Sequence, residues 1–210
     1  MMTEAALSAL ENLRSTDHLS WYVIPLLTFV IYVYAAEVHK KNWHIVLTGL
    51  LFFLGEFAWE MFNALVLHLS GFSALWVTPG RSAYIVLAGL NVEIMSMFAV
   101  AGVILAKSLP EDEKLKIAGI PNRILIPLLW GLFCVFVEVL LNQAGMLIWD
   151  YWWWSWPHVY LIVFVYVAPF FLVRWIYDRL SLKTKTRGVY VLLAVDVAAW
   201  VLFVNILHWI

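Results

Sequence analysis

Hydrophobic positions gather into six long stretches, separated by short polar or basic segments. The stretches are residues 21–36, 43–69, 82–106, 124–148, 157–177 and 188–210. Each can cross the hydrocarbon of a bilayer as a helix of about 20 residues, although the first needs flanking residues to do so. The sequence has no strand-like alternation that would indicate a barrel, and no internal repeat. We therefore predict an all-α, polytopic transmembrane helix bundle of about six spans.

Composition supports the same class of protein. Of the 210 residues, 64% are hydrophobic and only 13% are charged, whereas the apolar share of a soluble domain is nearer to half. We expect residues 21–210 to form a single bundle and residues 1–20 to form an amphipathic surface segment, which lacks the basic and apolar regions of a cleaved signal. The lone cysteine, Cys134, lies in an apolar stretch and excludes an intramolecular disulfide.

Lysine and arginine concentrate in alternate connecting segments, which predicts the orientation of the bundle. Only Arg14 and Arg81 lie in the first set of segments. The other set holds Lys40, Lys41, Lys107, Lys114, Lys116, Arg123, Arg174, Arg179, Lys183, Lys185 and Arg187. Because positive charge is retained on the cytoplasmic side, we expect the basic loops to be cytoplasmic and both termini to face outward.

Polar residues recur inside the predicted spans. Glu56, Glu60 and Asn63 share one helix face, because 3.6 residues per turn aligns positions i, i+4 and i+7. Other polar residues are Asn91 and Glu93 near the middle of the third stretch, Glu138 and Asn142 four residues apart in the fourth, and Asp196 near mid-depth in the last. With the orientation above, these groups fall in the middle and outer half of the bundle. We expect them to line one cavity that opens outward.

Carboxylates inside a membrane need an explanation, because no lysine or arginine lies deep enough in the spans to pair with them. Burial favours the neutral form of a carboxylic acid, so we expect some of the acids to be protonated. A neutral acid beside an ionised one suits general acid and base chemistry on a substrate without a polar handle. In this interpretation Glu60 donates the proton, and Glu56, Glu138 and Asp196 complete the polar site.

The remaining polar residues of the spans have two interpretations each. Asn63, Asn91, Glu93 and Asn142 can orient a substrate, or they can tie helices together through hydrogen bonds, as a neutral Glu60 also could. The tryptophan-rich segment 149–158 can anchor the protein at the interface. Alternatively, Trp153 and Trp154, together with Trp59, can present ring faces that stabilise positive charge on a substrate.

Metal and cofactor sites have little support. His68, His158 and His208 map to the outer ends of three predicted spans, where they could hold zinc or be ordinary interfacial histidines. The sequence contains no histidine pair at metal-binding spacing, no nucleophile elbow, no phosphate loop and no dinucleotide fingerprint. We therefore expect no cofactor and no nucleic-acid partner.

A Trp-Glu pair in an early helix, Trp59-Glu60, and an acid in the last helix, Asp196, resemble the small integral-membrane terpenoid cyclases of meroterpenoid pathways. The resemblance rests on these positions and on the general architecture. It implies that Glu60 and Asp196 are the acids that protonate an epoxide or alkene of a prenyl chain, without a metal. That family has seven helices, one more than the stretches counted here. Membrane-bound carotenoid cyclases and hydratases are similar in the same general way.

Two functions follow from these observations. The first is an integral membrane enzyme that performs proton-initiated cyclisation, isomerisation or hydration of a lipid-like, isoprenoid substrate. The second is a proton- or cation-coupled transporter or channel, since intramembrane carboxylates also mark ion pathways. Polarity confined to the outer half, and the lack of paired repeats, favour the enzyme. The sequence assigns no oligomeric state.

Overall fold

Helices make up most of the molecule. The computed structural model describes residues 1–80 and 82–210, and these contain seven α-helices. They are α1 (Glu4–Glu11), α2 (Val23–His39), α3 (Trp43–Ser70), α4 (Val92–Ser108), α5 (Asn122–Gln143), α6 (Tyr160–Arg179) and α7 (Leu182–Trp200). A π-helical segment, Val201–Ile206, extends α7, and Trp152–Trp154 form a 3-10 turn. Each of the six predicted stretches contains one of the helices α2 to α7, so the helical class is confirmed.

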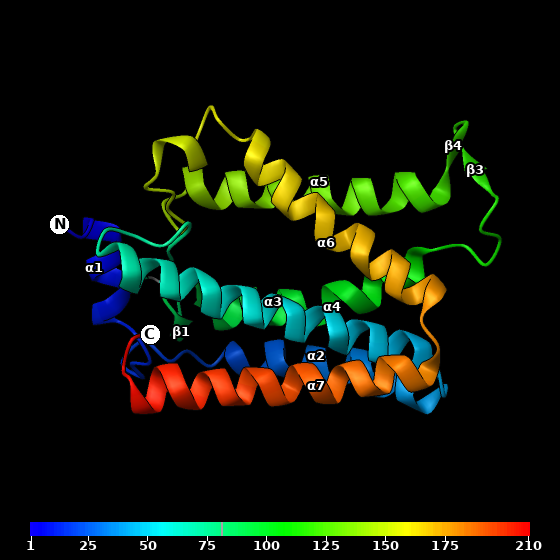
Figure 1. Cartoon of the computed structure of the whole chain (residues 1–210), viewed down its shortest axis with the longest axis horizontal. Coiled ribbons are helices and arrows are strands. Elements are labelled where there is room, and N and C mark those ends of the chain that lie inside the picture. The colour runs from blue at the N-terminus through cyan, green and yellow to red at the C-terminus, as the bar shows by residue number, and fades with distance from the viewer. Residues whose placement is uncertain (81) are drawn as a thin grey trace.

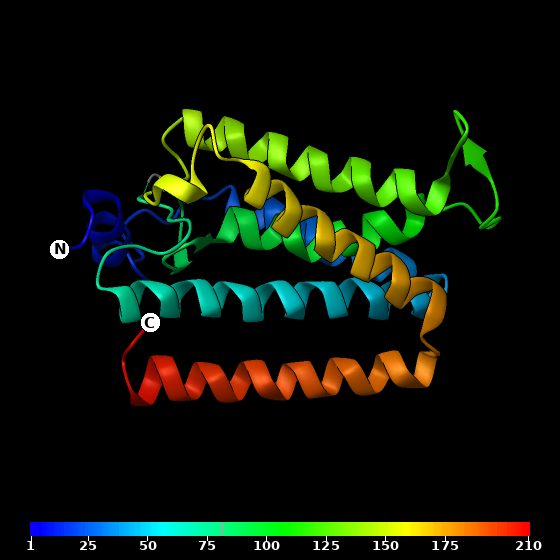
Figure 2. The same cartoon turned by 45° about the horizontal axis from the view of Figure 1, so that its top comes forward.

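The central element of the bundle is α3, which packs against α4 and α7 and also contacts α2 and α6. The second pair of neighbours is α5 and α6, and Figure 1 shows α6 running diagonally from α5 toward the start of α3. Turning the molecule shows α7 at the edge of the bundle, beside α3 (Figure 2). The chain therefore folds around α3, with α6 and α7 on different sides of it.

Four helices are long and apolar enough to cross a membrane: α3, α5, α6 and the continuous helix Leu182–Ile206. By contrast, α2 and α4 have 17 residues each. Large apolar side chains on the outside of the bundle are exposed, among them Phe136 (58%) and Phe164 (71%). An apolar exterior of this kind is typical of a surface that faces lipid.

The third predicted stretch is only partly helical, so the expected span over residues 82–106 is wrong in its first half. Residues Ile85–Leu87 (β1) and Leu90–Asn91 (β2) form an antiparallel hairpin, and α4 begins after it. The Asn91 side chain stops the helix from starting earlier, because it caps α4 by accepting a hydrogen bond from the Ile94 amide at 2.8 Å. The first half is apolar because it is buried in protein, since Leu87 and Leu90 are at most 1% exposed.

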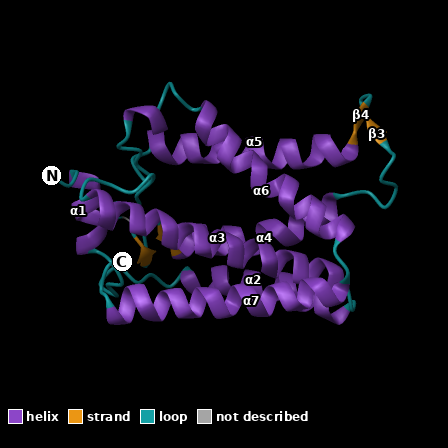
Figure 3. Ribbon diagram, in the orientation of Figure 1, coloured by secondary structure: helices purple, strands orange, loops and turns teal. Residues whose placement is uncertain are grey.

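Connections at this end of the molecule are long, contrary to the short connectors predicted. Residues 71–80 and 82–91 of the connection between α3 and α4 fold back over the ends of the helices, with α1 packed on them through Ala6 and Ala9. Asp150 ties the pieces together by accepting hydrogen bonds from Thr3 (2.7 Å) and Ser73 (2.6 Å). The second hairpin, β3 (Lys116–Ile117) with β4 (Ile120–Pro121), lies at the opposite end (Figure 3).

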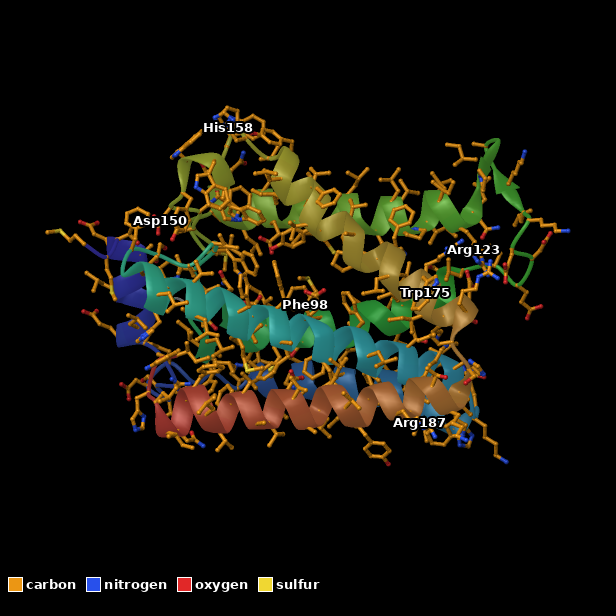
Figure 4. All side chains as sticks on the ribbon, in the orientation of Figure 1. Phe98, Arg123, Asp150, His158, Trp175 and Arg187 are labelled. Carbon is orange, nitrogen blue, oxygen red and sulfur yellow. The ribbon has the colours of Figure 1, made fainter. Side chains whose placement is uncertain are left out.

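Side chains of opposite character mark the two ends. Figure 4 shows Arg123 and Arg187 at one end and Asp150 and His158 at the other, with Phe98 between them. Charged groups at the arginine end are also buried: Glu37 is 1% exposed and forms an ion pair with Lys107 at 2.6 Å. Glu37 and Lys107 lie just outside the predicted stretches, so the prediction that polarity within the spans falls in their middle and outer half stays a prediction. Helix ends are tied there by ion pairs between residues far apart in the sequence.

Candidate functional site

Three carboxyl groups lie together in the middle of the bundle. Glu56 and Glu60 come from successive turns of α3, and Glu138 comes from α5. Glu60 and Glu138 are each 2% exposed, and all three groups are close enough to interact electrostatically. None of them forms an ion pair with a lysine or arginine of residues 1–80 or 82–210. We call these three residues the acid cluster; its members were predicted to share one site, and the structure brings them together.

Glu60 is held by a tryptophan from the connection between α3 and α4. The Trp76 indole N–H donates to both carboxyl oxygens of Glu60, at 3.1 Å each. Asn63 lies one turn further along α3, is fully buried, and holds the backbone of Leu75 and Trp76. Its amide donates to the Trp76 carbonyl (2.9 Å), and its oxygen accepts from the Leu75 amide (2.8 Å). Asn63 therefore positions Trp76, which in turn orients Glu60.

The approach of this connection to α3 depends on Gly89, which lies between β1 and β2. A Cβ atom at this position would lie 2.8 Å from Trp76 Nε1 and would also collide with the Asn63 amide. Real Cβ contacts are not that short, so a larger residue would push Trp76 away from Glu60. The hairpin therefore allows the Trp76 indole to lie within hydrogen-bonding distance of Glu60.

Aromatic rings surround the acid cluster. The Trp154 ring stacks on Trp76 with centroids 6.1 Å apart, and the rings of Trp59 and Tyr166 both lie 6.4 Å from Trp76. Tyr166, on α6, also presents its hydroxyl toward Glu138. Because the face of an aromatic ring is electron-rich, walls of this kind stabilise a cation better than an aliphatic wall does.

An elongated cavity of about 500 Å³ lies between α3 and α6 and reaches the acid cluster. Its walls are mainly apolar, and Glu56 is the one carboxyl among the residues that line it. No side chain or backbone group within residues 1–80 and 82–210 forms a hydrogen bond with the Glu56 carboxyl. Glu60 lies one turn behind it and does not line the cavity. Glu56 is therefore the member of the acid cluster that borders the cavity.

The cavity opens sideways between two helices. Residues that line it and also lie on the outside of the bundle include Trp59, Phe164 and Leu172, which are 38%, 71% and 55% exposed. The rim of this opening is apolar and lies on helices of spanning length, so it faces the region that the hydrocarbon of a bilayer would occupy.

Asp196, predicted as a second acid of the site, does not join the acid cluster. It is 3% exposed on α7, does not line the cavity, and exerts no influence on Glu60 comparable to that of Glu56 or Glu138. Its two carboxyl oxygens have no hydrogen-bond partner among the described residues. The reason is geometric, because α7 packs on a side of α3 away from α5 and α6.

Other predicted site residues secure the ends of helices. Asn91 and Glu93 do not lie mid-span, because α4 starts beside them; Glu93 accepts hydrogen bonds from Ser82 Oγ (2.6 Å), the Ala83 amide (3.1 Å) and the Tyr22 hydroxyl. Asn142 donates to the Leu147 carbonyl (3.0 Å) and closes the turn after α5. These side chains hold the backbone and are absent from the cavity wall.

The tryptophan-rich segment divides into two roles. Trp154 is 4% exposed and faces the acid cluster, and Trp153 packs against the same core. Trp152 and Trp156 are 74% and 70% exposed and are placed where interfacial anchors lie. The two interpretations offered by the sequence therefore concern different rings, and both stay predictions.

The three outer histidines do not converge, so the zinc site considered for them is wrong. His68 stacks on Trp209 with centroids 4.8 Å apart, whereas His158 lies beside Trp152 and Tyr160. Across residues 1–80 and 82–210, no group of three histidine, cysteine or carboxyl side chains is arranged to hold a metal ion. His208 directly precedes the stacked Trp209 and is exposed.

Two residues of the site were missed from the sequence. Trp76 lies in a segment between two predicted spans, and the apolar run Leu75-Trp76-Val77 was the available signal that this connection is buried. Tyr166 sits in an apolar stretch with no acid or amide around it, so nothing in the local pattern distinguished it from a core residue.

The helix lengths, the apolar exterior and the buried acid cluster define a helical integral membrane protein. The chain belongs to a family described as an uncharacterized membrane protein family, whose model matches residues 3–205. An uncharacterized protein from Archaeoglobus fulgidus is 44% identical over 211 residues, covering all of both chains. No solved structure matches the chain.

Proposed function

We propose that the protein is an integral membrane enzyme that transfers a proton to an apolar, isoprenoid-like substrate. The observation that carries this proposal is the cavity between α3 and α6, which has apolar and aromatic walls, opens toward lipid, and meets Glu56 of the acid cluster. A hydrocarbon has no polar group for a carboxyl side chain to bind. Proton transfer is therefore the role that a carboxyl on such a wall can play.

The arrangement assigns the steps to particular groups. Glu56 gives its proton to a carbon of an alkene or to the oxygen of an epoxide, and positive charge develops on the adjacent carbon. Trp59, Trp76 and Tyr166 face that region and stabilise the cation. The cycle closes when a C–H proton returns to a carboxylate, in cyclisation or isomerisation, or when water adds and gives up a proton, in hydration.

Glu60 acts behind Glu56 in this scheme. The sequence suggested Glu60 as the donor, as did the likeness to membrane terpenoid cyclases, but its oxygens are occupied by the Trp76 indole and it does not line the cavity. One helical turn away from Glu56, it is placed to pass a proton forward and to take it back. Glu138 supplies the third carboxyl of this relay.

The proposed membrane arrangement has six spans, with α2 and α4 included. Their 17 residues correspond to about 26 Å at 1.5 Å per residue, close to the roughly 30 Å of bilayer hydrocarbon. Both termini lie at the end opposite the basic residues (Figure 1), so the positive-inside rule makes the basic loops cytoplasmic and the termini external.

The experiment that tests the proposal is lipid analysis of membranes and of purified protein carrying Glu56→Gln. The amide keeps the size of the side chain but cannot donate a carboxylic proton, so we expect conversion to fall by about 10²-fold or more and a precursor to accumulate. Mass spectrometry of extracted lipids measures both. Glu113→Gln, an exposed position in the basic half, is the matched control.

An unchanged lipid profile in Glu56→Gln, with a folded protein at normal abundance, would contradict the proposal. The same is true if Glu113→Gln causes an equal change, because the effect would then not come from the cavity.

A proton- or cation-coupled transporter is the second candidate, and one observation favours it. Buried charges also occur at the basic end, where Lys185 is 0% exposed and Arg123 is 7% exposed. The cavity wall between that end and Glu56 is formed by Leu51, Phe52 and Val173, which interrupts a hydrated path. Proton flux into liposomes that is lost in Glu56→Gln, without any change in lipids, would select the transporter.

A further inference from the structure

A buried lysine lies where α3, α6 and α7 meet. Lys185, in the first turns of α7, is 0% exposed. Its ammonium group donates to Thr48 Oγ1 (3.0 Å), to the Tyr177 carbonyl (3.1 Å) and to His44 Nδ1 (3.3 Å). All three acceptors are neutral, and no carboxylate of the described chain forms an ion pair with Lys185. A buried cation without an anion is costly, so this charge calls for a partner.

Two arginines, Arg123 and Arg174, share a single carboxylate. Asp178, whose side chain is 3% exposed, pairs with Arg123 Nε (3.0 Å) and with Arg174 Nε (3.2 Å). It also lies close enough to Lys185 to interact with it electrostatically. The contact of Arg174 Nε with Asp178 is an ion pair without hydrogen-bond geometry, and this buried atom makes no hydrogen bond among the described residues. We call Arg123, Arg174, Asp178 and Lys185 the basic cluster.

The basic cluster has an excess of two positive charges, because three cations face one carboxylate. The carbonyl groups at the C-terminal end of α6 offset part of this excess, and the Tyr177 carbonyl is one of them. Carbonyl dipoles at a helix end amount to about half a charge, so more than one positive charge is left uncompensated.

The cavity extends from the acid cluster toward Lys185. On α3 its wall includes Leu51, one turn after Thr48, and on α6 it ends at Ile176, directly before Tyr177. Thr48 and Tyr177 both hold Lys185, so the ammonium group lies just past this end of the cavity, although Lys185 is not among the residues that line it. The lining residues of α6 run from Phe164 to Ile176, or about 18 Å along the helix.

We infer that the ligand of this cavity is a single-chain amphiphile with a phosphate head, whose head binds beside Lys185 and whose apolar chain extends toward Glu56. A phosphate monoester carries about −1.5 to −2 charges at neutral pH, which matches the excess of the basic cluster better than a carboxylate or an uncharged alcohol does. This inference deepens the proposed function and rests on it only for the chemistry at the far end of the chain.

The test compares binding of three probes to the purified protein in detergent: geranylgeranyl monophosphate, geranylgeraniol and inorganic phosphate. We expect the wild type to bind the phosphate ester at least tenfold more tightly than the alcohol. Lys185→Met should remove this preference while leaving alcohol binding within about twofold. Arg187→Met, an exposed neighbour on α7, is the matched control and should keep the preference.

Two further variants make the outcome independent of the folding of Lys185→Met. Arg174→Met, at a side chain that is 27% exposed, should lower the preference for the ester at least threefold. Ile176→Trp, at the end of the cavity nearest to Lys185, should weaken binding of both isoprenoids together. Equal affinity of the wild type for ester and alcohol would overturn the inference.

The inorganic probe separates a lipid head from a free anion. We expect inorganic phosphate to bind at least a hundredfold more weakly than the ester, because it lacks the chain. Binding of inorganic phosphate as tight as that of the ester would also overturn the inference, since a free anion would then be the ligand. Glu56→Gln should bind the ester normally, so loss of conversion there and loss of head-group binding in Lys185→Met report on different claims.

Discussion

The acid cluster and the basic cluster lie toward opposite ends of one cavity and have opposite imbalances of ionisable groups. The acid cluster places three carboxyls together without a cation and surrounds them with aromatic rings. The basic cluster places three cations around one carboxylate and joins α5, α6 and α7 through them. Carboxyls without cations can stay neutral and hold protons, whereas arginines stay charged and must be paired. Neutralising a carboxyl should therefore have different consequences at the two ends.

The largest effect is expected at the basic cluster. Asp178→Asn leaves the buried Arg123 and the partly buried Arg174 without their carboxylate, and removing one partner of a buried ion pair costs about 3–5 kcal/mol of stability. Thermal unfolding in detergent, followed by tryptophan fluorescence, measures this loss. Glu111→Gln, in an exposed loop at the same end, is the control and should unfold like the wild type. A stable Asp178→Asn variant would remove the contrast between the clusters.

At the other end, stability should depend on aromatic packing instead of charge. Trp154→Ala removes a ring that is 4% exposed and stacked on Trp76, and we expect a loss of about 3 kcal/mol. That value is at the low end for a buried tryptophan, since a loop can partly collapse into the space. Trp152→Ala, at a ring that is 74% exposed, should change stability in detergent by less than about 0.5 kcal/mol. Equal losses would mean that Trp154 is not part of the packed wall.

A smaller loss is expected for the residue that positions Trp76. Asn63→Ala leaves the Trp76 carbonyl and the Leu75 amide without their partner, which costs about 2 kcal/mol. Because Trp76 then moves relative to Glu60, conversion of the lipid substrate should fall as well. Asn205→Ala, at an exposed amide on the extension of α7, should alter neither property. Loss of stability with unchanged conversion would show that Glu60 does not need the indole.

The smallest effect on stability is expected at Glu138. Glu138→Gln removes a carboxyl whose Oε2 atom has no hydrogen-bond partner within the described ranges, so unfolding should shift by less than about 1 kcal/mol. Lipid conversion should nevertheless fall, since the amide cannot exchange a carboxylic proton. The same unfolding and lipid measurements apply. A loss of stability as large as that of Asp178→Asn would show that the acid cluster is held by charge after all.

The helices were predictable from the sequence because long apolar runs have few solutions in a membrane. The error at residues 82–106 has the same origin. An apolar run is equally compatible with a buried strand, and only the capping side chain of Asn91 and the close approach of Gly89 distinguish the two. Helical spacing likewise placed Glu56, Glu60 and Asn63 on one face, which is a property of a single helix.

Relations between helices were not predictable in the same way. Glu138 and Asp196 look alike in the sequence, since each is an acid within an apolar stretch. Glu138 joins the acid cluster because α5 lies across the cavity from α3, while α7 packs elsewhere on α3 and leaves Asp196 apart. The rotation and neighbour of each helix decide this, and neither is encoded in local spacing.

The sequence by itself determined the helical membrane class, the alignment of the acids on α3 and the concentration of basic residues at one end, because these depend on hydropathy, helical period and charge order. The tertiary structure decided which acids meet, that Glu56 and not Glu60 faces the cavity, and that Trp76 returns from a connection to bind Glu60. It also placed Lys185 near Asp178, the carboxylate that the two arginines share, through contacts among three helices. Such arrangements arise from packing between distant segments, which no local pattern of residues specifies.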